Sequence, residues 1–283
     1  MMVRRIAVSG SAIPALKIAR RILHNVLYLL TLMFPFSAHG EPATLDVPMD
    51  SGELRKIVTD HDRRIATSPD DAKAYLARGE AYFRLQEFDK AIEDFSTALQ
   101  HNDRLDEAYF GRGMARGRSG QLKEGISDLS VYIQRHPDSS LAHTKRGVRY
   151  IWTGDLENAE KDLKRAIALD ARNAEAHDDL GVILAQRGDY ATAISHFQAT
   201  LQSDPSYQKA HHNLAMVYYI TGESQKALTS VEASLKLLSE SRDSMLLKAS
   251  ILESLGRHVE AKAAREEAEF MPVGNRSERA AVQ

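Results

Sequence analysis

Residues 174–207 read AEAHDDLGVILAQRGDYATAISHFQATLQSDPSY, and the tripeptide Arg187-Gly188-Asp189 stands in the middle of this stretch. Such a tripeptide can be an adhesive motif on an exposed loop, or it can be a structural turn. Three residues in this order occur by chance in many chains. The residues around the tripeptide therefore have to decide between the two interpretations.

The pattern around Gly188 recurs every 34 residues along the chain. One series at this spacing comprises Gly120, Gly154, Gly188, Gly222 and Gly256. A second comprises Gly79, Gly113, Gly147, Gly181, Ala215 and Ala249, and a third comprises Ala91, Gly125, Ala159, Ala193, Ala227 and Ala261. Because the three series keep one register without insertion, they define six units: 72–105, 106–139, 140–173, 174–207, 208–241 and 242–272.

Each unit is predicted to contain two amphipathic helices joined by a turn. In the first unit, helical spacing of i, i+3, i+4 and i+7 is found twice, in Tyr75, Arg78, Gly79 and Tyr82 and again in Ala91, Ile92, Phe95, Ala98 and Leu99. A glycine between the helices can adopt positive φ and end the first helix. The small residues of the other two series let the paired helices approach closely. Arg187-Gly188-Asp189 is therefore predicted to be a turn.

These three series resemble the tetratricopeptide repeat family, whose 34-residue helix-turn-helix units carry small residues at such positions. The resemblance covers residues 72–272 and implies an all-α, right-handed solenoid with a concave inner surface. It specifies the fold and says almost nothing of the ligand. Proteins of the family are scaffolds that bind other proteins, so the resemblance implies an interaction module and no enzyme.

The segment before the repeats has a different character. Residues 1–40 hold five basic and no acidic residues, an apolar run at 26–36 and small residues at 38–40. That order is typical of a secretory signal peptide, and the apolar run is shorter than the roughly 20 residues of a membrane-spanning helix. We expect a cleaved signal or an N-terminal anchor, with an organelle presequence as a further alternative. The expected location is periplasmic or cell-envelope, with membrane contact only if the segment is uncleaved.

The two ends of the repeat array are predicted to differ. Residues 41–71 are interpreted as a linker and an N-terminal capping helix, which places Leu54, Ile57, Val58 and Ile65 on one face. Residues 273–283 are polar and are expected to form a flexible tail without a capping helix. Phe270 is therefore expected to stay partly exposed.

Composition and motifs exclude several classes of chemistry. The chain has no cysteine, and without residues 1–40 it keeps 32 basic and 39 acidic residues, a net charge of −7 that argues against nucleic acid as a partner. No nucleophile motif, phosphate loop, dinucleotide fingerprint or zinc-binding spacing is present. We therefore expect no catalytic residue, no metal, no cofactor and no small-molecule substrate. The eleven histidines are interpreted as scattered surface residues.

Arginine and aspartate vary together among the units. Arginine at the seventh place accompanies aspartate at the twenty-third place in the first three units, whereas the later units have neither. The residues concerned are Arg78 and Asp94 in the first unit, Arg112 and Asp128 in the second, and Arg146 and Asp162 in the third. We predict that each arginine reaches an aspartate across a helix pair, in its own unit or in the adjacent one, where the contact specifies geometry more than it stabilises.

The resemblance also implies which residues face a ligand, since the family uses defined positions of each first helix. Carried over to this chain, they give Phe83, Arg84, Phe110, Met114, Arg118, Lys145, Val148, Ile151, Trp152, Asp178, Asp179, Val182, Asn213, Met216 and Tyr219. Basic residues lie toward the first units and acidic ones around Asp178 and Asp179. This mixture suits an extended or helical segment of another protein, with Trp152 as its anchor or as part of the core. The alternative is a homo-oligomeric spacer that associates through uncapped ends.

Overall fold

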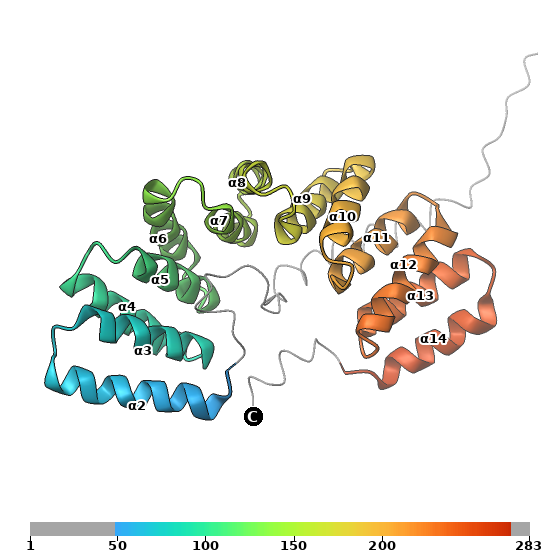
Figure 1. Ribbon diagram of the computed structural model, residues 1–283. Helices are drawn as coiled ribbons and strands as arrows, with labels where there is room; N and C mark the ends of the chain where they lie inside the picture. Colours follow the sequence, from blue (N-terminus) through green and yellow to red (C-terminus); the bar gives the residue numbers. More distant parts are fainter. Residues whose placement is uncertain (1–48, 273–283) are drawn as a thin grey trace, which may run out of the picture. The chain divides into compact units, whose positions relative to one another are not determined.

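The computed structural model describes residues 49–272, in which all regular secondary structure is helical (Figure 1). The predicted leader at 1–40 and tail at 273–283 lie outside the described residues. The helices are α2 (Ser51–Thr67), α3 (Ala72–Arg84), α4 (Phe88–His101), α5 (Asp106–Arg118), α6 (Leu122–Arg135), α7 (Ser140–Thr153), α8 (Leu156–Leu169), α9 (Ala174–Gln186), α10 (Tyr190–Ser203), α11 (Gln208–Ile220), α12 (Ser224–Leu237), α13 (Arg242–Ser254) and α14 (His258–Phe270). No described helix is long and apolar enough to cross a membrane.

The helices form consecutive pairs with the period read from the sequence. The first helices of the units begin 34 residues apart, at Ala72, Asp106, Ser140, Ala174, Gln208 and Arg242. Each of α3, α5, α7, α9 and α13 packs on the helix that follows it, and α4, α6, α8 and α12 pack on the first helix of the next pair. The all-α solenoid expected from the repeats is therefore confirmed.

The chain divides into two compact units, whose described parts are residues 49–210 and 211–272. In the first of these, α3, α5, α7 and α9 also contact one another in sequence. Figure 1 shows α5 and α7 on the inner side of the curve and α6 and α8 on its outer side. First helices from successive repeats thus share one surface.

The tripeptide at 187–189 is a turn, as predicted. Arg187 ends α9, Gly188 follows with a φ of 84°, and the carboxylate of Asp189 accepts a hydrogen bond of 3.2 Å from the backbone N–H of Thr192 at the start of α10. Positive φ suits glycine because it has no Cβ. The first unit departs from this rule, since Gln86 occupies the same place with a φ of 61°.

Small residues bring the paired helices into close contact. A Cβ added to Gly125 on α6 would lie 2.9 Å from the carbonyl oxygen of Gly113 on α5, and one added to Gly113 would lie 3.0 Å from Leu129. Larger side chains at these places would push the helices apart. The role predicted for these two series is confirmed at this pair.

The predicted arginine–aspartate pairs form within each of the first three units. In every case the arginine Nε and Nη2 donate to the two carboxylate oxygens of the aspartate sixteen residues later, over distances of 2.7–2.9 Å. The aspartates are buried. Two parallel bonds between planar groups fix the angle as well as the distance between the helices.

In the fourth unit Leu180 stands in place of the arginine and His196 in place of the aspartate, and His196 contacts His177 instead. His177 Nδ1 lies 2.9 Å from His196 Nδ1, which links α9 to α10. His143 is also buried and reaches Asp162 at 3.1 Å. The interpretation of the histidines as scattered surface residues is therefore wrong for these three, because the inner faces of the helix pairs enclose them.

The two ends of the described chain are unlike. Helix α2 packs on α3 with Leu54 and Val58 buried and with Ile57 and Ile65 partly buried. Helix α14 is the last described helix, and 89% of the Phe270 surface is exposed, as expected.

Candidate functional site

The predicted site residues lie on the first helices of five units. Twelve of them belong to the compact unit that includes residues 49–210: Phe83 and Arg84 on α3, Phe110, Met114 and Arg118 on α5, Lys145, Val148, Ile151 and Trp152 on α7, and Asp178, Asp179 and Val182 on α9. Asn213, Met216 and Tyr219 lie on α11 in the other compact unit. The two sets are therefore separate parts of the structure.

Most of the apolar members are buried in the repeat packing. Phe83, Phe110 and Met114 belong to one core cluster, and Ile151 belongs to a second one, against which Trp152 packs. Val148, Val182 and Met216 are buried as well, as is the polar Asn213. Arg84, Arg118, Trp152 and Tyr219 keep part of their surface exposed. These four side chains offer more surface for contact than the buried ones.

Arg149 is a buried charged residue that the family positions did not include. Only 3% of its surface is exposed, and its guanidinium lies 5.5 Å from the centre of the Trp152 ring. Gly117 makes room for it, since a Cβ there would lie 2.4 Å from Arg149 Nε. In the sequence, the signal for this contact was Gly117 itself, a glycine that lies inside a helix and outside the three series of small residues. Arg149 and Trp152 thus form a cation–π contact on α7.

A cluster of buried and partly buried charged residues joins α7 to α9. The ammonium of Lys145 lies 3.0 and 2.7 Å from the two carboxylate oxygens of Glu175, and Lys145 itself is buried. One turn further along α9, Asp178 and Asp179 are also buried. Lys209, at the start of α11, interacts electrostatically with Glu175, Asp178 and Asp179. We call these five residues the charged cluster.

Asp179 is the member of the charged cluster with a buried carboxylate oxygen that accepts no hydrogen bond from the described residues. Only 2% of its surface is exposed. Burial, reinforced by Glu175 and Asp178, raises the pKa of Asp179 well above its usual range, against the opposite effect of Lys209 and Lys145. Burial also lowers the pKa of Lys209, although the three carboxylates oppose that change. Burial therefore outweighs the two lysines in setting the pKa of Asp179.

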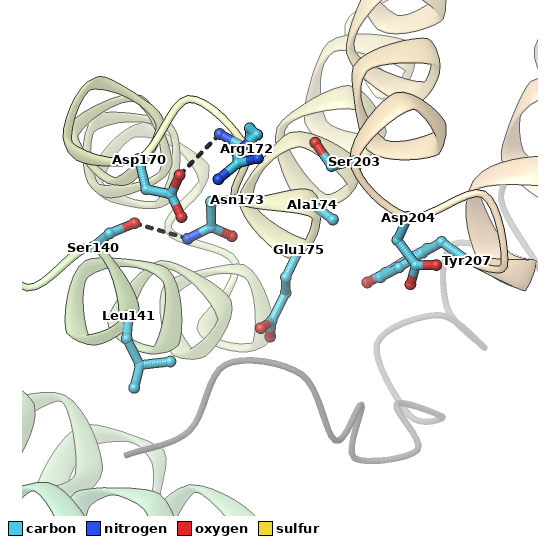
Figure 2. Close-up of a pocket in the computed structure, with 10 residues that line it drawn as sticks. All are labelled: Ser140, Leu141, Asp170, Arg172, Asn173, Ala174, Glu175, Ser203, Asp204 and Tyr207. Carbon is cyan, nitrogen blue, oxygen red and sulfur yellow. Dashed lines mark hydrogen bonds between the residues drawn. The ribbon is translucent and has the colours of Figure 1, made fainter. Parts of the chain in front are cut away.

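A pocket of about 480 Å³ opens beside the charged cluster (Figure 2). Its lining comes from the start of α7, the turn before α9, the first turn of α9 and the turn before α11: Ser140, Leu141, Asp170, Arg172, Asn173, Ala174, Glu175, Ser203, Asp204 and Tyr207. Figure 2 shows the hydroxyl end of Tyr207 directed toward the side of the pocket where Glu175 lies. Burial first, and then the negative charges of Asp178 and Asp179, raise the pKa of Tyr207 well above its usual range. The pocket and the charged cluster are thus neighbours.

Asn173 holds the two helices at this pocket in register. Its side-chain oxygen accepts from the backbone N–H of Ala176 at 2.9 Å and so caps α9. Its amide donates to the hydroxyl of Ser140 at 2.8 Å (Figure 2) and to that of Thr144 at 2.9 Å, both on α7. The start of α9 is therefore tied directly to α7, and the pocket wall is preorganised.

Within residues 49–272, no group of three histidine or acidic residues is arranged to hold a metal ion. The chemistry of the pocket is instead that of carboxylates, hydroxyls, an amide, a phenol and the guanidinium of Arg172. Such groups bind cationic and hydrogen-bonding partners through electrostatics.

Four models of the tetratricopeptide repeat match the chain, at residues 72–104, 107–139, 144–208 and 184–236. No curated protein sequence matches it. Its fold is similar to those in crystal structures of the APC/C hetero-tetramer Cut9-Hcn1 (TM-score 0.63, 18% identity, covering 90% of this chain and 54% of that chain) and of a tetratricopeptide repeat protein from Parabacteroides merdae (TM-score 0.63, 17% identity, covering 79% and 89%).

YrrB, whose crystal structure is described as that of a repeat protein with an unusual peptide-binding site, is also similar (TM-score 0.52, 20% identity, covering 65% of this chain and 95% of that chain). The chain spans about half the length of the Cut9-Hcn1 chain that it matches. At these identities the likeness concerns the fold. Together with the four matching models, it shows that the chain belongs to the tetratricopeptide repeat family, whose members are generally non-catalytic protein-interaction modules.

Proposed function

We propose that this chain is a non-catalytic adaptor of the cell envelope that binds a segment of another protein along the surface formed by α3, α5, α7 and α9. The observation that carries the proposal is the pocket beside the charged cluster, which opens on the same first helices that hold most of the predicted site residues. An extended or helical segment bound along successive first helices would make one contact per repeat.

The partly exposed residues on these helices support the proposal that the partner binds to this surface. Arg84, Arg118 and Trp152 combine cationic and aromatic side chains, which are the types enriched at the energetic centres of protein interfaces. The peptide-binding site named for YrrB is a precedent in the same fold. The order of basic, apolar and small residues in 1–40 supports the envelope location.

The proposal is tested by capturing partners with the full chain from envelope extracts of the native cell. We expect Trp152→Ala and Arg118→Glu to remove the captured partner, because both change the surface of the first helices. Glu157→Lys, an exposed change on the outer helix α8, should leave capture intact. Circular dichroism of each variant checks that the helices are retained. Equal capture by all four proteins would contradict binding at this surface.

A second function, a homo-oligomeric spacer, is favoured by the exposure of α14. Val259 and Phe270 are 85% and 89% exposed. They lie three helical turns apart, so both are on the same face of α14. An uncovered apolar face at the end of a repeat array favours association.

A further inference from the structure

We infer that α14 pairs with α14 of a second copy of this chain, with the two helices antiparallel. The contact surface is the side of α14 that carries Val259, Ala263, Glu266 and Phe270, which we call the outer face of α14. The inference rests on the second function proposed above, a homo-oligomeric spacer. It adds the surface, the direction of the two helices and the residues that fix both.

The outer face of α14 differs from the same face of the other second helices. The places of Val259 and Phe270 are exposed in all six units. In the first five units they hold only charged residues, glutamine or alanine: Asp89, Lys123, Glu157, Ala191 and Gln225 at the place of Val259, and Gln100, Gln134, Ala168, Gln202 and Lys236 at the place of Phe270. Because these places face water in every repeat, large apolar residues there indicate contact with another surface.

The residues of the outer face follow one another along the helix. Val259, Ala263, Glu266 and Phe270 stand at i, i+4, i+7 and i+11, which places them on one side of α14. The buried residues of the helix lie on the opposite side: Ala261, Ala264 and Ala268. The outer face is therefore a surface of helix length that is separate from the packing of α14 in its own repeat.

An antiparallel pair makes this face complementary to itself. With a two-fold axis near the middle of α14, Val259 of each copy lies at the level of Phe270 of the other. Lys262 then lies within one residue's rise, about 1.5 Å, of the level of Glu266 of the other copy, on the same side of the contact. The pair thus has two apolar contacts and two ion pairs. A parallel pair would instead set Lys262 against Lys262 and Glu266 against Glu266.

Lys262 and Glu266 are available for such a contact. Within α14 the Lys262 Nζ atom lies 3.7 Å from Glu266 Oε1, and both side chains are largely exposed. An exposed ion pair of this kind contributes little inside a single helix. A second copy adds a partner for each charge without displacing a buried contact.

The charge of α14 favours a second copy over a membrane surface. The helix carries more acidic than basic residues: Glu260, Glu266, Glu267 and Glu269 against Lys262 and Arg265. Anionic lipids attract helices whose polar face is basic. A contact between two helices is also smaller than the roughly 1,200 Å² of a stable interface. We therefore expect a weak, reversible dimer that forms as the concentration rises.

Sedimentation velocity of the full chain, from low to high micromolar concentration, tests for this dimer. We expect the weight-average sedimentation coefficient to rise with concentration. Val259→Glu should raise the dissociation constant by roughly tenfold or more, because it places a carboxylate in each apolar contact. Gln225→Glu introduces a glutamate at the same place on α12 and should have no effect. Circular dichroism of each variant checks that the helices are retained.

Exchange of charges tests the direction of the helices. Lys262→Glu and Glu266→Lys should each weaken self-association several-fold, because like charges then meet in both ion pairs. An equimolar mixture of the two variants should associate more tightly than either variant alone, since opposite charges meet again in the mixed pair. The double variant Lys262→Glu with Glu266→Lys should associate like the wild type.

Three results would overturn the inference. A wild type that stays monomeric at every concentration, the result expected if residues 273–283 or a membrane cover this face, would remove the spacer function as well. Association that Val259→Glu leaves unchanged would place the contact elsewhere, while the spacer function stands. Single charge variants that associate as tightly as the wild type would contradict the antiparallel arrangement. Each of these results leaves the adaptor function standing.

Discussion

Gln86 occupies a backbone conformation that the other turns give to glycine. Its φ is 61°, whereas the corresponding glycines have φ values between 75° and 85°. A side chain at positive φ costs about 1 kcal/mol because Cβ approaches the following carbonyl. The turn itself is intact, since the backbone N–H groups of Gln86 and Glu87 donate to Phe83 and Tyr82 at 3.0 and 2.9 Å.

We therefore expect Gln86→Gly to raise the free energy of unfolding by about 0.5–1 kcal/mol, after the greater freedom of glycine in the unfolded chain is deducted. Chemical denaturation followed by circular dichroism measures the change. Gly120→Gln is the reciprocal variant, because a Cβ at Gly120 meets no atom within 4 Å and only backbone strain is added. It should lower stability by a similar amount. A loss of stability in Gln86→Gly would contradict the strain argument.

The arginine–aspartate pairs show how one additional hydrogen-bonding neighbour changes the pKa of a buried aspartate. Burial raises the pKa of Asp94, even though Arg78 donates two hydrogen bonds to it. Burial also opposes ionisation of Asp162, yet its pKa is lowered because His143 adds to the hydrogen bonds from Arg146. The arginine contact is therefore not sufficient by itself to lower the pKa of the buried aspartate. The sequence predicted the partners but could not predict this difference, which depends on a histidine folded against the pair.

At the scale of the helices, α9 and α10 are joined by the histidine pair of the fourth unit. Burial lowers the pKa of His177 and of His196, and the neighbouring His177 and Lys164 lower that of His196 further, while Asp170 and the carbonyl of Ala171 act in the opposite direction on His177. The unfolded chain then binds protons more readily than the folded one. The stability that the two neutral histidines contribute is complete above their pKa in the unfolded chain, about 6.5, and is lost as the pH falls below that value.

We expect the melting temperature of the wild-type chain to fall between pH 7.5 and 5.5, because protonating both rings leaves no acceptor for the hydrogen bond between them. His196→Asp recreates the contact of the third unit, where His143 lies 3.1 Å from Asp162. In that variant a protonated His177 gains a partner, so the fall should be smaller. His212, whose pKa is also lowered by burial, contributes to both proteins and cancels in the comparison. An equal fall in both would show that the pair does not cause the pH dependence.

At the scale of the molecule, the exposed face of α14 makes a prediction about assembly. We expect the full chain to self-associate at high micromolar concentration, as measured by light scattering, because Val259 and Phe270 present apolar surface to solvent. Phe270→Glu should shift the chain toward the monomer. Lys236→Glu, an exposed change on α12, is the matched control and should not. A monomeric wild type under these conditions would remove the spacer function and leave the adaptor function untouched.

The sequence by itself determined the repeat period, the helix pairs, the turn at 187–189 and the pairing of arginine with aspartate, while the structure showed that each pair lies within one unit. These features follow from local rules, since helical periodicity, glycine at positive φ and small residues at contacts recur in every unit. Only the tertiary structure decided which candidate side chains are enclosed in the core and that Arg149 lies over Trp152. It also decided that Ser140, Glu175 and Tyr207, which belong to different parts of the chain, line one pocket. The reason is physical, because burial and electrostatic potential depend on every neighbour in space, and neighbouring repeats supply those neighbours from positions about 30 residues away in the sequence.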